Sequence, residues 1–136
     1  MKKAKRILLV DDDVDDQMYF RDAVSEVSPS LQCEIANNGS EALQQIAVPP
    51  PPDLIFMDLN MPVMNGYECL VTLRKMEQYK DIPIIIFTTS NNSHDIAQAK
   101  KLGAALYFTK PADFKMLCNK LDRILDLDFS RFNFVL

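Results

Sequence analysis

Carboxylate, hydroxyl and ammonium side chains stand directly after four short apolar runs of the sequence. They are the acid pair Asp11 and Asp12, the acid Asp58, the hydroxyl of Thr88 and the ammonium of Lys110. Carboxylates that are crowded together repel and raise one another's pKa values unless a cation lies between them. A divalent ion, above all Mg²⁺, relieves this repulsion because it prefers oxygen ligands and keeps positions free for water and phosphate. With a lysine and a hydroxyl beside it, the set is suited to stabilising a phosphoryl group in transit.

The elements that must position these side chains alternate between strand and helix patterns along the whole chain. Apolar runs predict strands at residues 7–10, 31–35, 54–57, 82–87 and 105–108. Apolar residues at helical spacing follow each strand. They predict helices at about 14–27, 40–47, 66–76 and 113–127, together with one that ends at residue 102. Five strand–helix units in succession predict an α/β fold, a doubly wound five-stranded parallel sheet with helices on both faces. Ligands of such folds lie outside the carboxyl ends of the strands, where the five polar side chains fall.

Length and charge limit the function classes. The 136 residues fit one domain, and no apolar stretch is long enough to span a bilayer. The net charge of -4, from 19 acidic and 15 basic residues, argues against nucleic acid or an anionic membrane as a direct partner. Three cysteines without paired spacing (Cys33, Cys69 and Cys118) predict buried, reduced thiols in a cytosolic protein.

The acidic residues are concentrated near the N-terminus, where five of the 19 lie between positions 11 and 16. Asp13, Asp15 and Asp16 fall at the N-cap and in the first turn of the helix predicted at 14–27, where carboxylates complement the helix dipole and its free N–H groups. Asp11 and Asp12 directly follow the buried strand, and capping explains them poorly. We therefore expect this pair to bind a metal ion and the other three to serve the helix.

The motifs, taken together and in order, resemble a known family. LLVDD at residues 8–12, DLIFMDLNMPVMNG at 53–66, IIIFT at 84–88 and the pair Lys110–Pro111 look like the receiver domain of two-component response regulators, specifically the stand-alone, chemotaxis-regulator-like kind. The resemblance covers a core of about residues 6–127 in a single receiver domain of residues 1–136, with 128–136 as an aromatic C-terminal tail. It implies the flavodoxin-like strand order 2-1-3-4-5.

The resemblance also implies a role for each site residue. Asp58 accepts a phosphoryl group from the phosphohistidine of a sensor histidine kinase or a histidine phosphotransfer protein. Lys110 pairs with the acyl phosphate, ahead of a cis peptide bond to Pro111. The residues that hold Mg²⁺ are Asp11, Asp12, Asp58 and Asn60, the last through its backbone carbonyl. Thr88 reorients to bond the phosphate, and Tyr107 is the switch aromatic that then turns inward. Such a protein phosphorylates and dephosphorylates itself in a Mg²⁺-dependent way without being a turnover enzyme.

The output expected from the resemblance is a protein contact made in the cytoplasm. The face built from the fourth helix, fifth strand and fifth helix would bind a downstream protein, and neither nucleic acid nor a membrane is expected to take part. In the tail, Phe132, Phe134 and Leu136 alternate like a strand. The tail either folds back over its own domain or contributes to a homodimer or partner interface.

Three rival interpretations share parts of this pattern. A haloacid-dehalogenase-type phosphatase needs a second acid two residues after its nucleophile, and Asn60 stands there. A flavodoxin-like mononucleotide binder needs phosphate donors after the first strand, whereas Asp11, Asp12 and Asp13 would repel phosphate. A receiver that acts as an adaptor without phosphorylation is disfavoured by the complete set of site residues.

Overall fold

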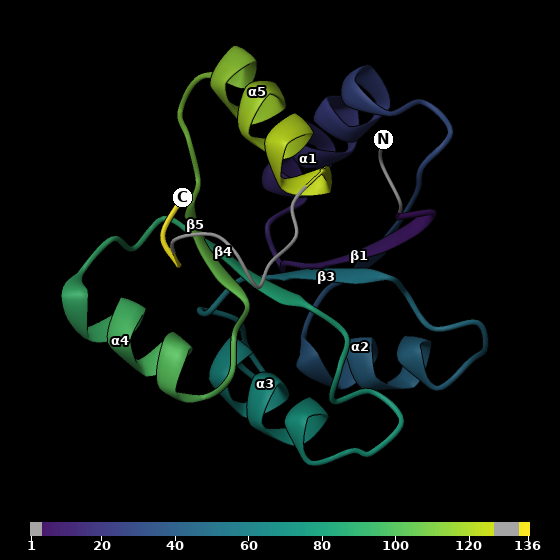
Figure 1. The fold of residues 1–136 in the computed structure, drawn as a ribbon, viewed down its shortest axis with the longest axis vertical. Helices are drawn as coiled ribbons and strands as arrows, with labels where there is room; N and C mark the ends of the chain where they lie inside the picture. Colours follow the sequence, from purple (N-terminus) through teal and green to yellow (C-terminus); the bar gives the residue numbers. More distant parts are fainter. Residues whose placement is uncertain (1–3, 127–133) are drawn as a thin grey trace.

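Five strands and five helices alternate in the computed structural model, which describes residues 4–126 and 134–136 (Figure 1). The strands are β1 (Arg6–Val10), β2 (Gln32–Ala36), β3 (Leu54–Met57), β4 (Ile84–Thr88) and β5 (Leu106–Thr109). The helices are α1 (Val14–Val27), α2 (Gly39–Ile46), α3 (Gly66–Arg74), α4 (Ser93–Lys101) and α5 (Phe114–Leu125). All neighbouring strands are parallel, in the order β2-β1-β3-β4-β5, which confirms the predicted fold.

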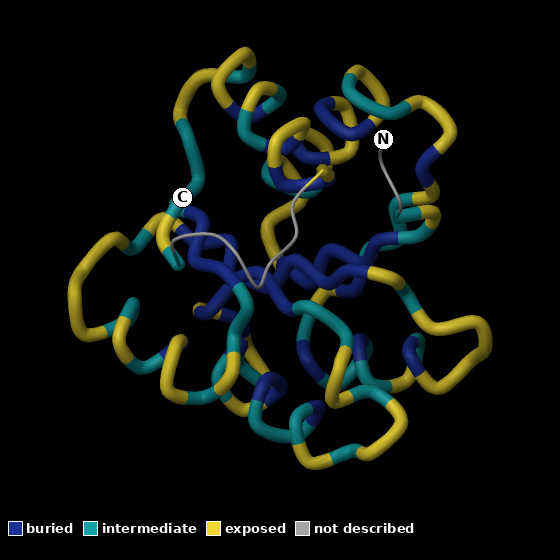
Figure 2. The backbone as a smooth tube through the Cα atoms, in the orientation of Figure 1, coloured by how far each residue is buried: buried dark blue, intermediate teal, exposed yellow. Residues whose placement is uncertain are grey.

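Helices cover both faces of the sheet, and the strands alternate their side chains between the two faces. Figure 1 shows α1 and α5 on one face and α2, α3 and α4 on the other. In β1, Ile7 and Leu9 pack with α1 and α5, whereas Leu8 and Val10 pack with α2 and α3. The sheet is therefore the buried layer in Figure 2, as expected of continuous apolar strands.

Each helix begins after an aspartate or asparagine whose side chain accepts a hydrogen bond from a backbone N–H of the first turn. Such caps satisfy donors that would otherwise be unpaired, at about 1 kcal/mol each. They also fix where each helix starts, and therefore the length of the loop between a strand end and its helix. The cap residues are Asp13, Asn38, Asn65, Asn92 and Asp113.

Three strands lie further along the chain than the sequence pattern predicts. β4 was expected at 82–87, but it spans Ile84–Thr88. Pro83 has no N–H for the ladder, so pairing begins with its carbonyl, which accepts from Ile55 N. β2 and β5 are shifted by one residue in the same direction. Thr88 consequently belongs to the last position of a strand and is fully buried.

Two further expectations need adjustment. All three cysteines are free, but only Cys69 is buried, and Cys33 and Cys118 are half-buried. α3 ends at Arg74, before Met76, and α5 ends at Leu125. In the tail, residues 128–133, including Phe129 and Phe132, lie outside the described residues.

Candidate functional site

The carboxyl ends of β1 and β3 lie side by side and bring the acidic residues together. Asp58 N donates to Val10 O at 2.9 Å, and Asp11 N donates to Ala36 O at 3.0 Å, so both aspartates extend the ladders of the sheet. Asp11 is fully buried, Asp58 is nearly so, and Asp12 is exposed. The parallel sheet thus fixes the backbone of the site to the same framework as the core.

Asp11, Asp12 and Asp58 form a cluster that fits a divalent cation. Each offers one carboxylate oxygen, and these oxygens lie within 4.8 Å of one another. Burial raises the pKa of Asp11 above its ordinary value and the charge of Asp58 adds to this, although Lys110 and the Asp13 N–H oppose it. A hard divalent ion favours such oxygen ligands and would offset this cost. The carboxylates predicted to bind metal are therefore brought together.

Lys110 reaches the same cluster from the end of β5. Its ammonium lies 2.7 Å from Asp11 Oδ2, 2.8 Å from Asp16 Oδ2 and 3.1 Å from Asp58 Oδ2. Burial alone would lower the pKa of Lys110, but the hydrogen bonds to Asp11 and Asp16 and the charge of Asp58 raise it above its ordinary value. Asp11 therefore shares the Lys110 ammonium with two other carboxylates, those of Asp16 and Asp58. One ammonium therefore leaves the cluster short of positive charge.

Asp16 is a site residue that the sequence analysis assigned only to the first turn of α1. Asp13 is the cap, as expected, and accepts from Asp16 N at 3.0 Å. The carboxylate of Asp16 instead extends to Lys110. The signal available in the sequence was the charge imbalance, since a single predicted site lysine faced five nearby aspartates.

The peptide bond between Lys110 and Pro111 is trans, which corrects the expected cis bond. Among the described residues the cis peptide bond is between Pro49 and Pro50. The trans form is the intrinsically favoured one for X–Pro bonds. It also places the Lys110 ammonium within 3.1 Å of all three carboxylates that it contacts, so reaching them does not require a cis bond.

Thr88, the last residue of β4, and Tyr107, the second residue of β5, are both fully buried. The Thr88 hydroxyl finds no hydrogen-bond partner among residues 4–126 and 134–136. A buried polar group without a partner costs about 1–3 kcal/mol, which is the kind of cost found at functional sites. The Tyr107 hydroxyl donates to Ser90 O at 2.9 Å, so the ring points into the protein.

A hydrogen-bond network that the sequence analysis missed holds the loop between Thr88 and α4. Asp95 accepts from the Tyr67 hydroxyl on one oxygen and from the Ser90 hydroxyl on the other, at 2.7 Å. These bonds, the one from Tyr67 first, lower the pKa of Asp95. Asn92 also donates to both Asp95 and Ser90. The loop is thereby tied to α3 and α4.

The loop after β3 approaches Asp58 closely and explains Gly66. A Cβ at Gly66 would lie 2.2 Å from the Asp58 carbonyl oxygen, so only glycine fits without a backbone shift. Asn60, expected to offer a carbonyl to the metal, is exposed, and its N–H lies 3.4 Å from Asp58 Oδ1. In the same loop Val63 has a φ of 68° and Met64 N donates to Pro62 O, a strained γ-turn.

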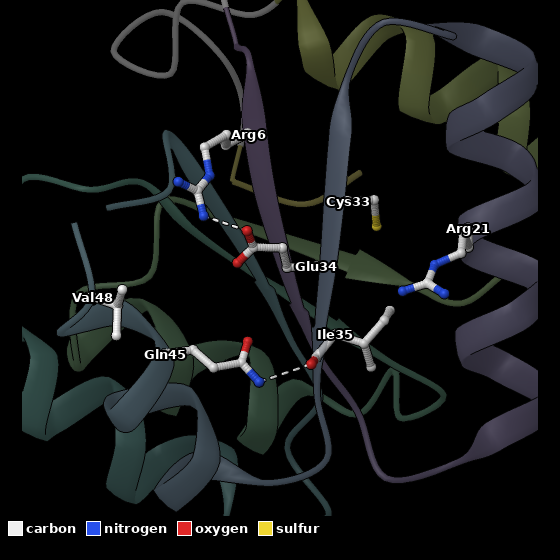
Figure 3. Close-up of a pocket in the computed structure, with 7 residues that line it drawn as sticks. All are labelled: Arg6, Arg21, Cys33, Glu34, Ile35, Gln45 and Val48. Atoms are coloured by element: carbon white, nitrogen blue, oxygen red, sulfur yellow. Dashed lines mark hydrogen bonds and ion pairs between the residues drawn. The ribbon is translucent and has the colours of Figure 1, made fainter. Parts of the chain in front are cut away.

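A hollow lies along β2, an edge strand of the sheet, away from the acidic cluster. Figure 3 shows Arg6 and Glu34 on one side of the strand and Cys33 and Arg21 on the other. Arg6 pairs with Glu34 and Gln45 donates to Ile35 O, while burial raises the pKa of the Cys33 thiol to about 11. These groups do not converge on a common point, and the thiol is a weak nucleophile. We therefore place the functional site at the carboxyl ends of the strands.

The fold and this site define a class of protein: a doubly wound α/β domain with a cluster of acidic residues at the carboxyl edge of its parallel sheet. The family described as "Response regulator receiver domain" matches residues 7–122. The chain belongs to this family. Within the described residues, no helix has both the length and the apolar character needed to cross a membrane.

Known relatives agree in sequence and in structure. Protein PilH of Pseudomonas aeruginosa is 35% identical over 88% of this chain and 97% of its own length. Chemotaxis protein CheY1 of Helicobacter pylori is 29% identical over 88% of this chain and 96% of its own. The phosphorylated cyanobacterial phytochrome response regulator RcpA has a TM-score of 0.84 at 28% identity, over 96% of this chain and 98% of its own. Response regulator Rcp1, solved in a Mn²⁺-bound form, has a TM-score of 0.80 at 26% identity, over 96% and 98%.

Proposed function

We propose that Asp58 accepts a phosphoryl group from a phosphohistidine of a sensor histidine kinase or a histidine phosphotransfer protein. The observation that carries this proposal is the convergence on Asp58 of two further carboxylates and the Lys110 ammonium, which lies 3.1 Å from its Oδ2. A carboxylate oxygen of Asp58 attacks phosphorus, the N–P bond breaks, and the histidine nitrogen leaves with the electron pair. The product is an aspartyl phosphate.

The residues around Asp58 fit a Mg²⁺ ion held by Asp11, Asp12 and Asp58, with the backbone carbonyl of Asn60 as the remaining protein ligand. When bound, the ion neutralises charge on the transferring group. Lys110, now shared among carboxylates, pairs with the acyl phosphate. The buried Thr88 hydroxyl gains the acceptor that it lacks by donating to a phosphate oxygen.

The phosphoryl group adds roughly -1.5 to -2 of charge at neutral pH, and the Thr88–Tyr107 pair responds to it as a two-state element. We propose that the resulting change alters protein contacts on the face of α4, β5 and α5. The protein would act in the cytoplasm as a stand-alone receiver of residues 1–136, with a downstream protein and neither nucleic acid nor a membrane as its target. It would also lose the phosphoryl group by its own hydrolysis, without turning over other substrates.

The test is covalent labelling of the purified protein with acetyl phosphate and Mg²⁺. Intact mass spectrometry should show the gain of one phosphoryl group, and peptide mapping should place it on Asp58. Asp58→Asn should abolish the gain. Asp15→Asn is the matched control, since Asp15 is an exposed carboxylate of α1 outside the cluster.

Three outcomes would overturn the proposal. The first is labelling of Asp58→Asn to the same extent as wild type. The second is continuous release of phosphate far beyond one equivalent from phosphate esters, which would indicate a phosphatase. The third is a protein that is never modified and that shows no Mg²⁺-dependent binding of beryllofluoride, which would indicate an adaptor that acts without phosphorylation.

A further inference from the structure

The end of the chain pairs with the outer edge of β5 through an isolated parallel bridge, and we call residues 134–136 the C-terminal strand. Tyr107 N donates to Phe134 O at 2.7 Å, and Leu136 N donates to Tyr107 O at 2.8 Å, in a parallel bridge between Tyr107 and Val135. Figure 1 shows this segment, in yellow, beside β5. Both backbone polar groups of Tyr107 are therefore satisfied by the C-terminus. Without it they would lie unpaired on the open edge of the sheet.

The side chains of this C-terminal strand straddle the sheet edge. The Phe134 ring packs in the cluster of the α2, α3 and α4 face, with its centroid 6.4 Å from that of Tyr107. Leu136 packs on the opposite face, in the cluster of α1 and α5. Val135, between them, is 48% exposed. In a regular strand residues i and i+2 share one face, so the strand-like alternation predicted from the sequence is not present over residues 134–136. The segment instead folds back on its own domain and packs on both faces of the sheet edge.

Tyr107 is held from three directions in this arrangement. Its backbone is bonded to the C-terminal strand, its ring contacts Phe134, and its hydroxyl donates to Ser90 O at 2.9 Å. The side chain is fully buried. A ring that swung outward would have to leave the Ser90 carbonyl and enter the space beyond β5. Phe134 and the C-terminal strand border that space.

We propose that Phe134 is a positioning residue that keeps Tyr107 inward, so that docking of the C-terminal strand and occupation of Asp58 by a phosphoryl group favour each other. This inference rests on the proposed function, in which the inward Tyr107 accompanies recruitment of Thr88. The coupling needs no direct contact between the C-terminus and Asp58. It follows because both events favour the same position of one side chain.

The first test measures hydrogen exchange of the Tyr107 amide by NMR in the full-length protein, without Mg²⁺ or beryllofluoride. Phe134→Ala should speed this exchange by about tenfold, the effect of removing a half-buried aromatic ring from the docked strand. Val135→Ala is the matched control and should leave the rate unchanged, because that side chain faces solvent. Leu136→Pro, which removes the N–H that donates to Tyr107 O together with the packed leucine side chain, should also accelerate exchange. Equal rates in all four proteins would overturn strand docking.

The second test measures the affinity for beryllofluoride at saturating Mg²⁺. Phe134→Ala should bind it several-fold more weakly than Val135→Ala, and Phe134→Leu should restore part of the affinity. Linkage requires the reciprocal effect: beryllofluoride should slow Tyr107 amide exchange in the wild type by a comparable factor. A purely structural Phe134 would leave affinity unchanged and would contradict the coupling.

The two proposals fail in different ways. If no variant, including the wild type, binds beryllofluoride, the proposed phosphoacceptor function fails, and the exchange rates still decide whether the strand docks. If Tyr107 protection rises with protein concentration, together with a dimer mass by light scattering, the strand comes from a second copy. That result would overturn docking of the C-terminus on its own β5.

Discussion

Replacing Gly66 by alanine tests whether the loop after β3 is as close to Asp58 as the structure indicates. The added Cβ would lie 2.2 Å from the Asp58 carbonyl oxygen and 2.9 Å from Leu59 Cα. The first distance is more than 1 Å short of the 3.4 Å at which ordinary contact begins. Both atoms belong to the backbone at the buried end of a central strand, so neither can move without disturbing the sheet.

Two effects of opposite sign compete in this substitution. Gly66 is the first residue of α3, and replacing a helical glycine by alanine gains up to about 1 kcal/mol through propensity and the unfolded state. Overpacking against fixed backbone costs about 1–3 kcal/mol or more. Because the overlap exceeds 1 Å, we expect the clash to prevail and Gly66→Ala to lose at least about 2 kcal/mol of unfolding free energy.

Urea unfolding monitored by circular dichroism measures this change, with Gly39→Ala as the control. A Cβ at Gly39 would meet the flexible Met64 side chain at 2.7 Å and 2.9 Å, which can rotate away. It would also lie 3.0 Å from the Cβ of Cys69, a much smaller overlap than the one at Gly66. Its cost should therefore stay within about 1 kcal/mol. A Gly66→Ala protein as stable as wild type, or more stable, would refute the close approach. The folded fraction of Gly66→Ala should also bind Mg²⁺ more weakly, because the displaced carbonyl belongs to Asp58.

Three further predictions concern charge, backbone strain and the thiols. Lys110→Met should lower the free energy of unfolding in urea by about 3 kcal/mol, because buried Asp11 loses its cation. Added Mg²⁺ should reduce the difference in unfolding free energy between the variant and the wild type, and a difference unchanged by Mg²⁺ would contradict this. Val63→Gly should stabilise the protein by about 1 kcal/mol, since the exposed valine has a φ of 68°, which glycine adopts without strain. A lower melting temperature of this variant in thermal unfolding would contradict the inferred strain. Burial raises the pKa of Cys33 to about 11 and that of Cys69 to about 12 from an ordinary 9.0, so iodoacetamide should label these two thiols of the folded protein slowly at about pH 8. The same two thiols should make the free energy of unfolding depend on pH. Their contribution to stability is complete below about pH 9 and is lost as the pH rises toward 11 and 12, because the thiols of the unfolded chain ionise first. A free energy of unfolding that stays constant across this range would contradict the prediction.

Elements bounded by strong local signals could be predicted to the residue. α1 has its expected bounds because Asp13 caps its start and Pro29 follows soon after its end. β3 likewise has its expected bounds, Leu54–Met57, since an aspartate stands on each side of a continuous apolar run. β4 was misplaced because the apolar run begins at Ile82, whereas hydrogen bonding begins only with the Pro83 carbonyl. Apolar content predicts which residues are buried. The bounds of a strand depend instead on which residues have a backbone N–H that can pair with the neighbouring strand.

The residues of the site were predictable for similar reasons, but some of the hydrogen bonds and ion pairs between them were not. A parallel sheet places all strand ends at one edge, so Asp11, Asp58 and Lys110 follow from topology. The reach of Lys110 to Asp16 depends on how α1 packs against the sheet, which no local pattern encodes. The bond from Tyr67 to Asp95 joins α3 to α4, two helices on the same face of the sheet, and is equally non-local.

The charge at the site indicates the order in which its ligands can bind. The site holds four carboxylates, those of Asp11, Asp12, Asp16 and Asp58, and one ammonium, that of Lys110, which contacts all of them except Asp12. The formal charge is -3 when all five groups are ionised. The raised pKa of Asp11 shows that Lys110 alone does not compensate its burial. A phosphoryl donor that approached this cluster would meet net repulsion at a distance where screening is weak. A divalent cation reduces the formal charge to -1 and frees Lys110 to pair with the incoming group. In the proposed function, cation binding therefore has to precede phosphoryl transfer.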